Sequence, residues 1–104
     1  MATQTDSWIL STVSNGESKP RVPRSWSYSA TLTGTGAVTA TITIQVRAGS
    51  GGHWIDYGTM SLSGTTSVSD YLPPGDAPYV DHRAICSAIS DTGASVVVSA
   101  AGGV

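Results

Sequence analysis

Apolar and polar residues alternate without a break between Gly36 and Arg47. The apolar positions are Val38, Ala40, Ile42, Ile44 and Val46, and the polar positions are Thr39, Thr41, Thr43, Gln45 and Arg47. Successive side chains of a β-strand point to opposite faces, so this pattern predicts a strand with one buried face and one face in water. Because such a strand needs neighbouring strands and a cover for its apolar face, it also predicts a sheet.

Shorter segments of the same kind fill the rest of the chain. Strands are expected at 8–13, 26–32, 36–47, 53–62 with a kink near Gly58, 66–71, 79–89 and 94–100. The glycines of 34–36 predict a hairpin turn, and the proline-containing segments 14–25 and 72–78 predict loops. Turn residues at this spacing, with no helical pattern, predict an all-β fold, an antiparallel β-sandwich or jelly-roll of about seven to eight strands. The strand order stays open.

The 104 residues have the length of one domain. We expect residues 1–25 to form an N-terminal strand or arm with a proline-containing loop, and residues 26–104 to form the β-sandwich domain. The core is expected to combine large rings with apolar strand positions, namely Trp8, Trp26 or Trp54 with Ile42, Ile44, Val46, Ile85, Val96 and Val98.

The charge balance narrows the classes of partner. Charged residues make up only 12% of the chain and the net charge is −2, which argues against a nucleic-acid partner. No apolar segment approaches the ~20 residues of a membrane-spanning helix, so no membrane partner is expected. Residues 1–6 lack a signal-peptide pattern, and we expect the chain to stay in the cytoplasm where it is made or to join an assembly there. Cys86 is the only cysteine, so we expect a buried thiol and no internal disulfide.

Candidate catalytic and metal-binding groups are few. His53 lies near Asp56 and His82 beside Asp81, but neighbouring residues on a strand point to opposite faces and cannot easily chelate together. We interpret all four as surface polar residues at loop ends. A nucleophilic serine on a strand-to-helix turn is not indicated, because no Gly-x-Ser-x-Gly motif is present.

Four aspartates flank the loops of the second half, Asp70, Asp76, Asp81 and Asp91. A calcium site built from them is conceivable, but their spacing is not that of a dedicated calcium loop. We therefore expect no catalytic residue, no metal site and no cofactor.

The second half also carries a recognisable order of segments. Residues 45–50 lead through glycines into 53–58, followed by Ser63-Gly64-Thr65-Thr66, a strand to Asp70, Tyr79, Arg83-Ala84-Ile85 and 91–98. Over residues 26–104 this order resembles the small β-sandwich virion proteins of tailed bacteriophages, of the head decoration, cement or fibre-associated type.

The resemblance implies a structural protein that performs no catalysis. It would bind the major capsid protein and further copies of itself, in many cases as a trimer, on the capsid surface of a virion assembled in the host cytoplasm. We expect Trp8, Arg21, Arg24 and Trp54 to be the contact residues at this protein interface. Two alternatives stay open: a tail, neck or fibre component of the virion, and a carbohydrate-binding β-sandwich module that stacks sugars on Trp54 and Tyr57.

Overall fold

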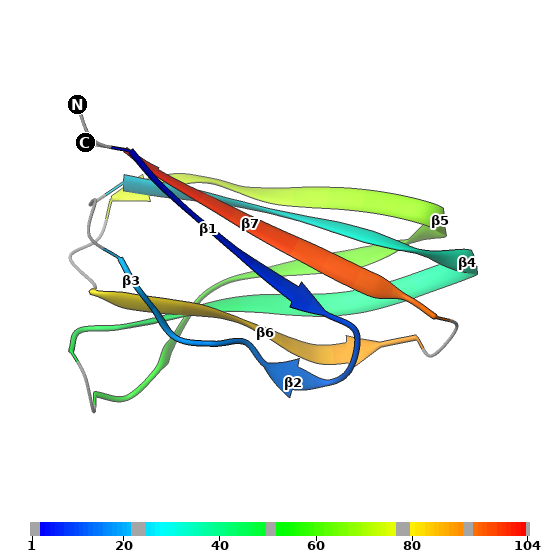
Figure 1. The fold of residues 1–104 in the computed structure, drawn as a ribbon, viewed down its shortest axis with the longest axis horizontal. Coiled ribbons are helices and arrows are strands. Elements are labelled where there is room, and N and C mark those ends of the chain that lie inside the picture. Colours follow the sequence, from blue (N-terminus) through cyan, green and yellow to red (C-terminus); the bar gives the residue numbers. More distant parts are fainter. Residues whose placement is uncertain (1–2, 22–24, 50–51, 77–79, 91–92, 104) are drawn as a thin grey trace.

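Two long strands organise the molecule. The computed structural model describes residues 3–21, 25–49, 52–76, 80–90 and 93–103, and within these ranges it contains seven antiparallel strands and no helix. The strands are β1 (Thr3–Leu10), β2 (Ser14–Asn15), β3 (Lys19–Pro20), β4 (Ser25–Arg47), β5 (Ile55–Asp76), β6 (Asp81–Ile89) and β7 (Ser95–Gly103). The long strands β4 and β5 pair along nearly their whole length (Figure 1). The predicted all-β fold is confirmed.

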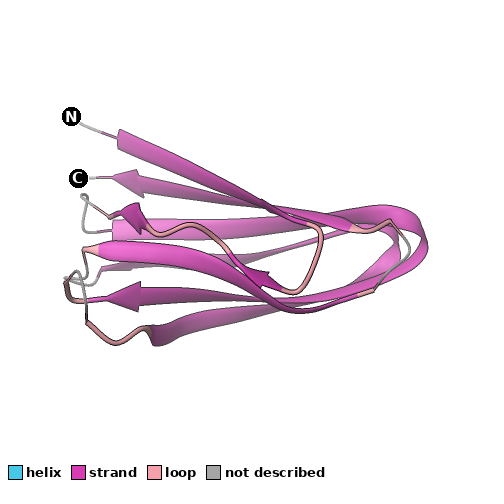
Figure 2. Ribbon diagram, turned by 60° about the horizontal axis from the view of Figure 1, so that its bottom comes forward, coloured by secondary structure: helices cyan, strands magenta, loops and turns pink. Residues whose placement is uncertain are grey.

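Strand β4 takes part in two layers because it changes neighbours halfway. Its first half pairs with β7, its second half pairs with β6, and β5 follows it on the other side throughout. Strand β1 adds to β7, and the short strands β2 and β3 add to β6. Figure 2 shows β4 and β5 bending together, so that the sheet folds over itself. We call the layer that contains β1 and β7 the first sheet and the layer that contains β6 the second sheet.

The predicted hairpin at 34–36 is wrong. These residues lie inside β4, and the two flanking segments pair with β5 and not with each other. The ladder is interrupted between Thr33 and Ala37, where Gly36 has a φ of 74° and Thr66 on the opposite strand a φ of 63°. Because irregularities on both strands coincide, the two-stranded ribbon bends as a unit and carries β4 from the first sheet into the second.

Two further turn predictions on β5 are also wrong. Residues 63–65, which separate the predicted strands 53–62 and 66–71, continue the ladder opposite β4. Within the predicted loop 72–78, Leu72, Gly75 and Asp76 also pair with β4. The prolines are tolerated because they fall in a register shift on an edge strand, where no amide is required for the ladder. The kink near Gly58 is confirmed, since the register shifts between the partners of Ile44 and Gln45.

The N-terminal segment belongs to the first sheet. Strand β1 begins earlier than predicted and pairs with β7 along its full length, from Thr3 opposite Gly103 to Leu10 opposite Val96. Within the predicted loop 14–25, two short strands pair with β6, and Gly16 donates a further backbone hydrogen bond to Ala84 at 2.7 Å.

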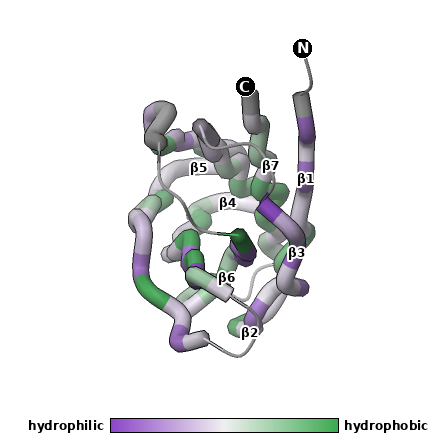
Figure 3. Tube along the Cα trace, turned by 90° about the vertical axis from the view of Figure 1, so that its left-hand side faces the viewer, coloured by the Kyte–Doolittle hydropathy of each residue, from purple (hydrophilic) through white to green (hydrophobic). Residues whose placement is uncertain are grey.

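The core lies between the two sheets. Figure 3 looks along the strands and shows them arranged around this interior. Trp8, Trp26, Ile42, Ile44, Val46, Val96 and Val98 are buried as predicted. Trp54 and Ile85 are only half-buried, because Trp54 precedes β5 and Ile85 lies on the outward side of β6 between inward-facing His82, Ala84 and Cys86.

Candidate functional site

Two of the four predicted contact residues lie inside the molecule. The Trp8 side chain is buried, and its Nε1 donates to the carbonyl oxygen of Glu17 at 2.7 Å. The Arg21 side chain is also buried, and its Nε donates to the Tyr28 hydroxyl at 3.3 Å. Their contact role stays a prediction that this burial does not favour, because little of either side chain can reach a partner. Arg24 lies outside the described residues.

Arg21 is the first member of a buried polar chain that joins the two sheets. The Tyr28 hydroxyl lies 3.0 Å from His82 Nδ1, and His82 Nε2 lies 2.7 Å from Asp6 Oδ2. Since Arg21 can only donate to Tyr28, a consistent chain has the tyrosine hydroxyl donating to Nδ1 and Nε2–H donating to the carboxylate. His82 is therefore assigned as the neutral Nε2–H tautomer.

Burial shifts the pKa values of two side chains in this buried polar chain. Burial lowers the pKa of His82, opposed by its hydrogen bond to Asp6, and burial raises the pKa of Tyr28, opposed by the hydrogen bond from Arg21. Trp8 and Trp26 pack edge-on against the imidazole, with ring centroids 5.1 and 4.5 Å away. The His82 imidazole, which is the group most easily protonated near neutral pH, is thus kept neutral by its apolar surroundings.

The prediction that His82 is a surface residue is wrong, because its side chain is fully buried. Its hydrogen-bond partner is Asp6, which is 76 positions away, and not the adjacent Asp81. Asp81 points to the other face, as predicted, and pairs with Arg47 at 2.8 Å. The carboxylate–imidazole–hydroxyl order resembles a nucleophilic triad, but the Tyr28 side chain is 1% exposed and both imidazole nitrogens are engaged.

Trp54 belongs to a second cluster, on the outer face of the second sheet. The guanidinium carbons of Arg47 and Arg83 each lie 4.4 Å from the centre of the indole ring. Arg83 Nε donates to Gln45 Oε1 at 2.9 Å, and Gln45 Nε2 donates to Asp56 Oδ1 at the same distance. Burial and the charge of Arg47 lower the pKa of Arg83. Together with Asp81, which pairs with Arg47, the cluster contains two arginines and two aspartates, and its polar groups bond largely to one another.

Tyr57 does not form a stacking row with Trp54. Its ring packs against that of Tyr28 at 5.8 Å between centroids, and the guanidinium of Arg21 lies 5.7 Å from its centre. The two rings proposed to hold a sugar therefore contact different groups, one on the outer face and one toward the interior.

The metal sites considered from sequence are not assembled in the described part of the chain. There, no three histidine, cysteine, aspartate or glutamate side chains lie together in a metal-binding arrangement. Asp70 accepts a hydrogen bond from the backbone amide of Tyr71 at 2.8 Å, and Asp91 lies outside the described residues. The described ranges contain no helix that is long and apolar enough to cross a membrane.

The outer face of the first sheet is the third candidate. Its side chains come from the odd-numbered positions of four strands, namely Thr5, Ser7, Ile9, Ser27, Ser29, Thr31, Thr33, Ser67, Ser69, Tyr71, Ser95, Val97, Ser99 and Ala101. We call this surface the serine face. Backbone register places Ser7, Ser99, Ser29 and Tyr71 side by side in one row across it. Among these described residues none carries a charge.

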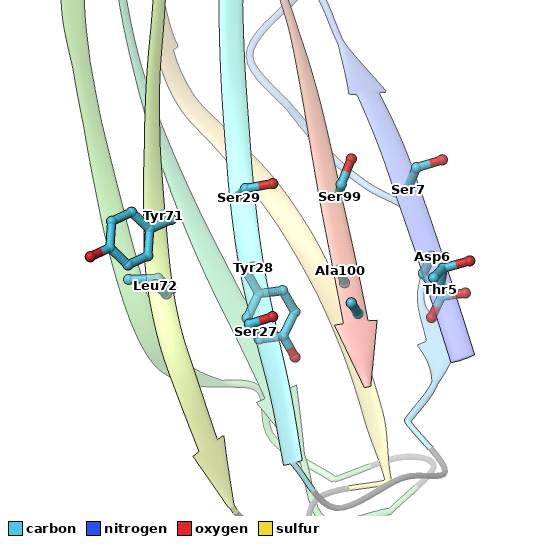
Figure 4. Close-up of a pocket in the computed structure, with 11 residues that line it drawn as sticks. Thr5, Asp6, Ser7, Ser27, Tyr28, Ser29, Tyr71, Leu72, Ser99 and Ala100 are labelled. Carbon is cyan, nitrogen blue, oxygen red and sulfur yellow. The ribbon is translucent and has the colours of Figure 1, made fainter. Parts of the chain in front are cut away.

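A shallow depression of about 590 Å³ crosses this face and is drawn in Figure 4. Its lining includes hydroxyl groups from all four strands and the ring of Tyr71. Tyr71 is 69% exposed, and Ile9 in the next row is 73% exposed. The serine face thus consists mainly of small, uncharged side chains, and two large side chains, Tyr71 and Ile9, project from it.

Sequence reasoning missed both the polar chain and the serine face. The alternation of Ser27, Ser29 and Thr31 with buried residues was a usable signal for the face, but its rows depend on strand register. No local signal could have paired Asp6 with His82.

Comparisons with known proteins give information on the fold alone. No family model matches the chain, and no curated protein sequence matches it. A crystal structure of PirA is similar over 92% of this chain and 90% of that one, with a TM-score of 0.51 and 20% identity. A structure of infectious bursal disease virus Gx strain is similar over 96% of this chain and 32% of that chain, with a TM-score of 0.46 and 10% identity. At these identities the likeness to PirA supports the β-sandwich fold alone.

Proposed function

We propose that this protein is a non-catalytic structural component of a bacteriophage virion, a decoration or cement protein that binds the major capsid protein on the capsid surface. The observation that carries the proposal is the uncharged serine face. The resemblance of residues 26–104 to phage virion β-sandwich proteins supplies the biological setting. No nucleic acid, membrane or cofactor takes part in the proposed function.

The composition of the serine face supports a role in protein contact. A solvated sheet face ordinarily carries lysine, glutamate and other charged residues, which are costly to remove from water. Removing hydroxyl and methyl groups from water costs less free energy than removing charged groups, and hydroxyls can form new hydrogen bonds across an interface. Exposed Ile9, Tyr71 and Val97 add apolar area to the same surface.

The interior polar chain supports the absence of catalysis. Tyr28 and His82 are sealed between the sheets, and their hydrogen bonds hold β4 to β6 and β6 to β1. The Trp54 cluster likewise balances its own charges. These features of the described polar clusters support a structural role for them in the proposed function.

Copy number in purified particles tests the proposal. Quantitative mass spectrometry should find on the order of hundreds of copies per particle for a protein on the capsid lattice, while about a dozen would indicate the tail or neck instead. Empty shells assembled from the major capsid protein should bind the purified chain saturably in a sedimentation assay. Absence from particles together with no shell binding would refute a virion role.

The depression beside Tyr71 favours one second candidate, a carbohydrate-binding module. Its hydroxyls and exposed ring could face a sugar, although the carboxylate that contributes to its lining, Asp6, is engaged with His82. Glycan binding that Tyr71→Ala abolishes, in a protein absent from particles, would support this candidate.

A further inference from the structure

Residues 14–21, which contain β2 and β3, close one side of the sandwich between β1 and β6. We call this segment the strap. It pairs with the outer edge of β6 (Figure 1). Gly16 and Arg21 add backbone hydrogen bonds to the carbonyl oxygens of Ala84 and Val80, each at 2.7 Å. The strap thus supplies the last strands of the second sheet.

The strap also contacts β1, but it is held less firmly than the strands beside it. Trp8 Nε1 donates to the Glu17 carbonyl at 2.7 Å, and Gln4 Nε2 donates to the Pro20 carbonyl at 3.1 Å. Strands β2 and β3 have two residues each, whereas β1 has eight and β4 has 23. A hollow of about 380 Å³ lies between β1 and the strap. Short ladders and incomplete packing are typical of a segment that opens separately from the rest of a fold.

The fully buried imidazole of His82 lies beneath the strap. Lys19 is its register partner on β3, and Arg21 Nε donates to the Tyr28 hydroxyl that meets His82 Nδ1. The strap therefore places two cations near the imidazole, and β1 places one bonded carboxylate, Asp6, on its other side. The remaining titratable groups on the packed elements are Glu17 beside Lys19, Tyr57 of β5 behind Tyr28, and the outward-facing Asp81 and Arg83 of β6 itself.

A proton on His82 does not fit this closed arrangement. Nδ1 would carry hydrogen and could no longer accept from the Tyr28 hydroxyl. The new positive charge would also lie near Lys19 and Arg21 in a site with little water. Burial, followed by the charges of Arg21 and Lys19, lowers the pKa of His82 and is opposed by Asp6. Opening the strap would move both cations away and admit water to the imidazole.

We propose that the strap opens as a unit when His82 takes up a proton, while the two sheets stay folded. This inference goes beyond the proposed function and does not depend on it. Opening leaves the outer edge of β6 without its paired strands and uncovers the Trp8 ring, against which Gly16 packs. The protein therefore presents a different surface on this side of the sandwich in mild acid.

The strap is the part that yields because the other partners of His82 are retained. Protonation turns the hydrogen bond from Nε2 to Asp6 into a charge-assisted one, which holds β1 in place. Strand β1 is also paired with β7 along its full length, and β4 pairs with strands on both sides. The opening is therefore local and distinct from a loss of global stability.

Native-state hydrogen exchange, followed by NMR in low urea, tests this proposal. Three hydrogens report on the strap, namely the backbone amides of Gly16 and Arg21 and the indole N–H of Trp8. They should share one opening free energy, smaller than that of global unfolding and nearly independent of urea. The amides between β4 and β7 should exchange only through global unfolding.

The pH dependence of this exchange identifies the proton. If His82 has its ordinary pKa of 6.5 in the open state, the open fraction should rise up to about 30-fold from pH 8 to pH 5, after correction for intrinsic exchange rates. His82→Gln should abolish this rise. The matched control, His53→Gln, replaces an exposed histidine and should keep it.

A disulfide lock provides a second variant that leaves His82 in place. Ser14 on the strap is the register partner of Cys86 on β6, and residues paired in this way are about 4.5–5.5 Å apart at Cα, a span that a disulfide bridges. Oxidised Ser14→Cys should suppress the local exchange of the Gly16 amide and remove its pH dependence. The same variant in its reduced form is the control and should open like the wild type.

Four results would overturn the proposal. The first is a wild-type strap whose hydrogens exchange only through global unfolding, and the second is a local opening that does not change between pH 8 and pH 5. The third is a folded His82→Gln protein that keeps the full rise in acid, and the fourth is an oxidised Ser14→Cys protein that opens as readily as its reduced form.

Discussion

His82 Nε2 lies 2.7 Å from Asp6 Oδ2 and joins β6 of the second sheet to β1, the edge strand of the first. The imidazole is fully buried, so the hydrogen bond forms in a setting of low effective dielectric. Its other nitrogen is held by Tyr28, which belongs to the first sheet. A single side chain thus connects the two layers at three strands, and its protonation state is coupled to folding.

Stability should therefore fall on mild acidification. Burial lowers the pKa of His82 below its ordinary value of 6.5, so at pH values between these two pKa values the unfolded chain binds a proton that the folded chain does not. The contribution is fully present above pH 6.5 and decreases as the pH falls toward the lowered pKa, by up to ~1.4 kcal/mol per pH unit. Urea unfolding between about pH 5 and pH 8 measures it.

His82→Gln and His53→Gln separate this effect from general acid sensitivity. His82→Gln should be less stable than the wild type at pH 8, and its free energy of unfolding should no longer decrease as the pH falls through this range. The second replaces an exposed histidine and should keep the wild-type profile. The assignment to His82 would be wrong if His82→Gln kept the full decrease.

Tyr28→Phe should cost about 1–3 kcal/mol of unfolding free energy. The change removes the hydroxyl between Arg21 and His82 and leaves buried polar groups with fewer hydrogen bonds. Tyr71→Phe is the matched control, and because Tyr71 is exposed its cost should stay within about 0.5 kcal/mol. Tryptophan fluorescence in urea measures both, and equal costs would contradict a structural role for the polar chain.

Gly102→Ala should lower the melting temperature by about 5–15 °C. A Cβ at this position would lie 2.5 Å from Cε2 of Trp26, whose ring is fully buried and has little room to move. Gly49→Ala is the control, because no atom lies within 4 Å of the added Cβ. Calorimetry compares the two, and a Gly102→Ala protein as stable as the control would mean that the Trp26 site can expand.

Cys86 should react slowly with a thiol reagent while the protein is folded. Burial raises the pKa of the thiol, so little thiolate is present and access is restricted. Ellman's reagent should modify one thiol quickly in urea and at least about 100-fold more slowly in native buffer. Rapid modification of the native protein would show that β6 opens readily.

The side of the sheet on which a residue lies could be predicted from the sequence wherever a strand was recognised. From Trp26 to Val46, even-numbered apolar residues face the interior on both sides of the bend, as their alternation indicated. The bend itself was misjudged, because glycines at 34–36 suit a reversal of the chain and a bent ribbon equally well. Which one forms depends on the partner strand, and β5 accompanies both halves.

The sequence by itself determined the class of fold and the inward or outward direction of most strand residues, since both follow from the local two-residue period of the β-strand. Only the tertiary structure decided the register of the strands, and with it the rows of the serine face and the meeting of Asp6 with His82. Register is set by backbone hydrogen bonds and packing between segments far apart in the chain. A local sequence pattern contains no information about these contacts.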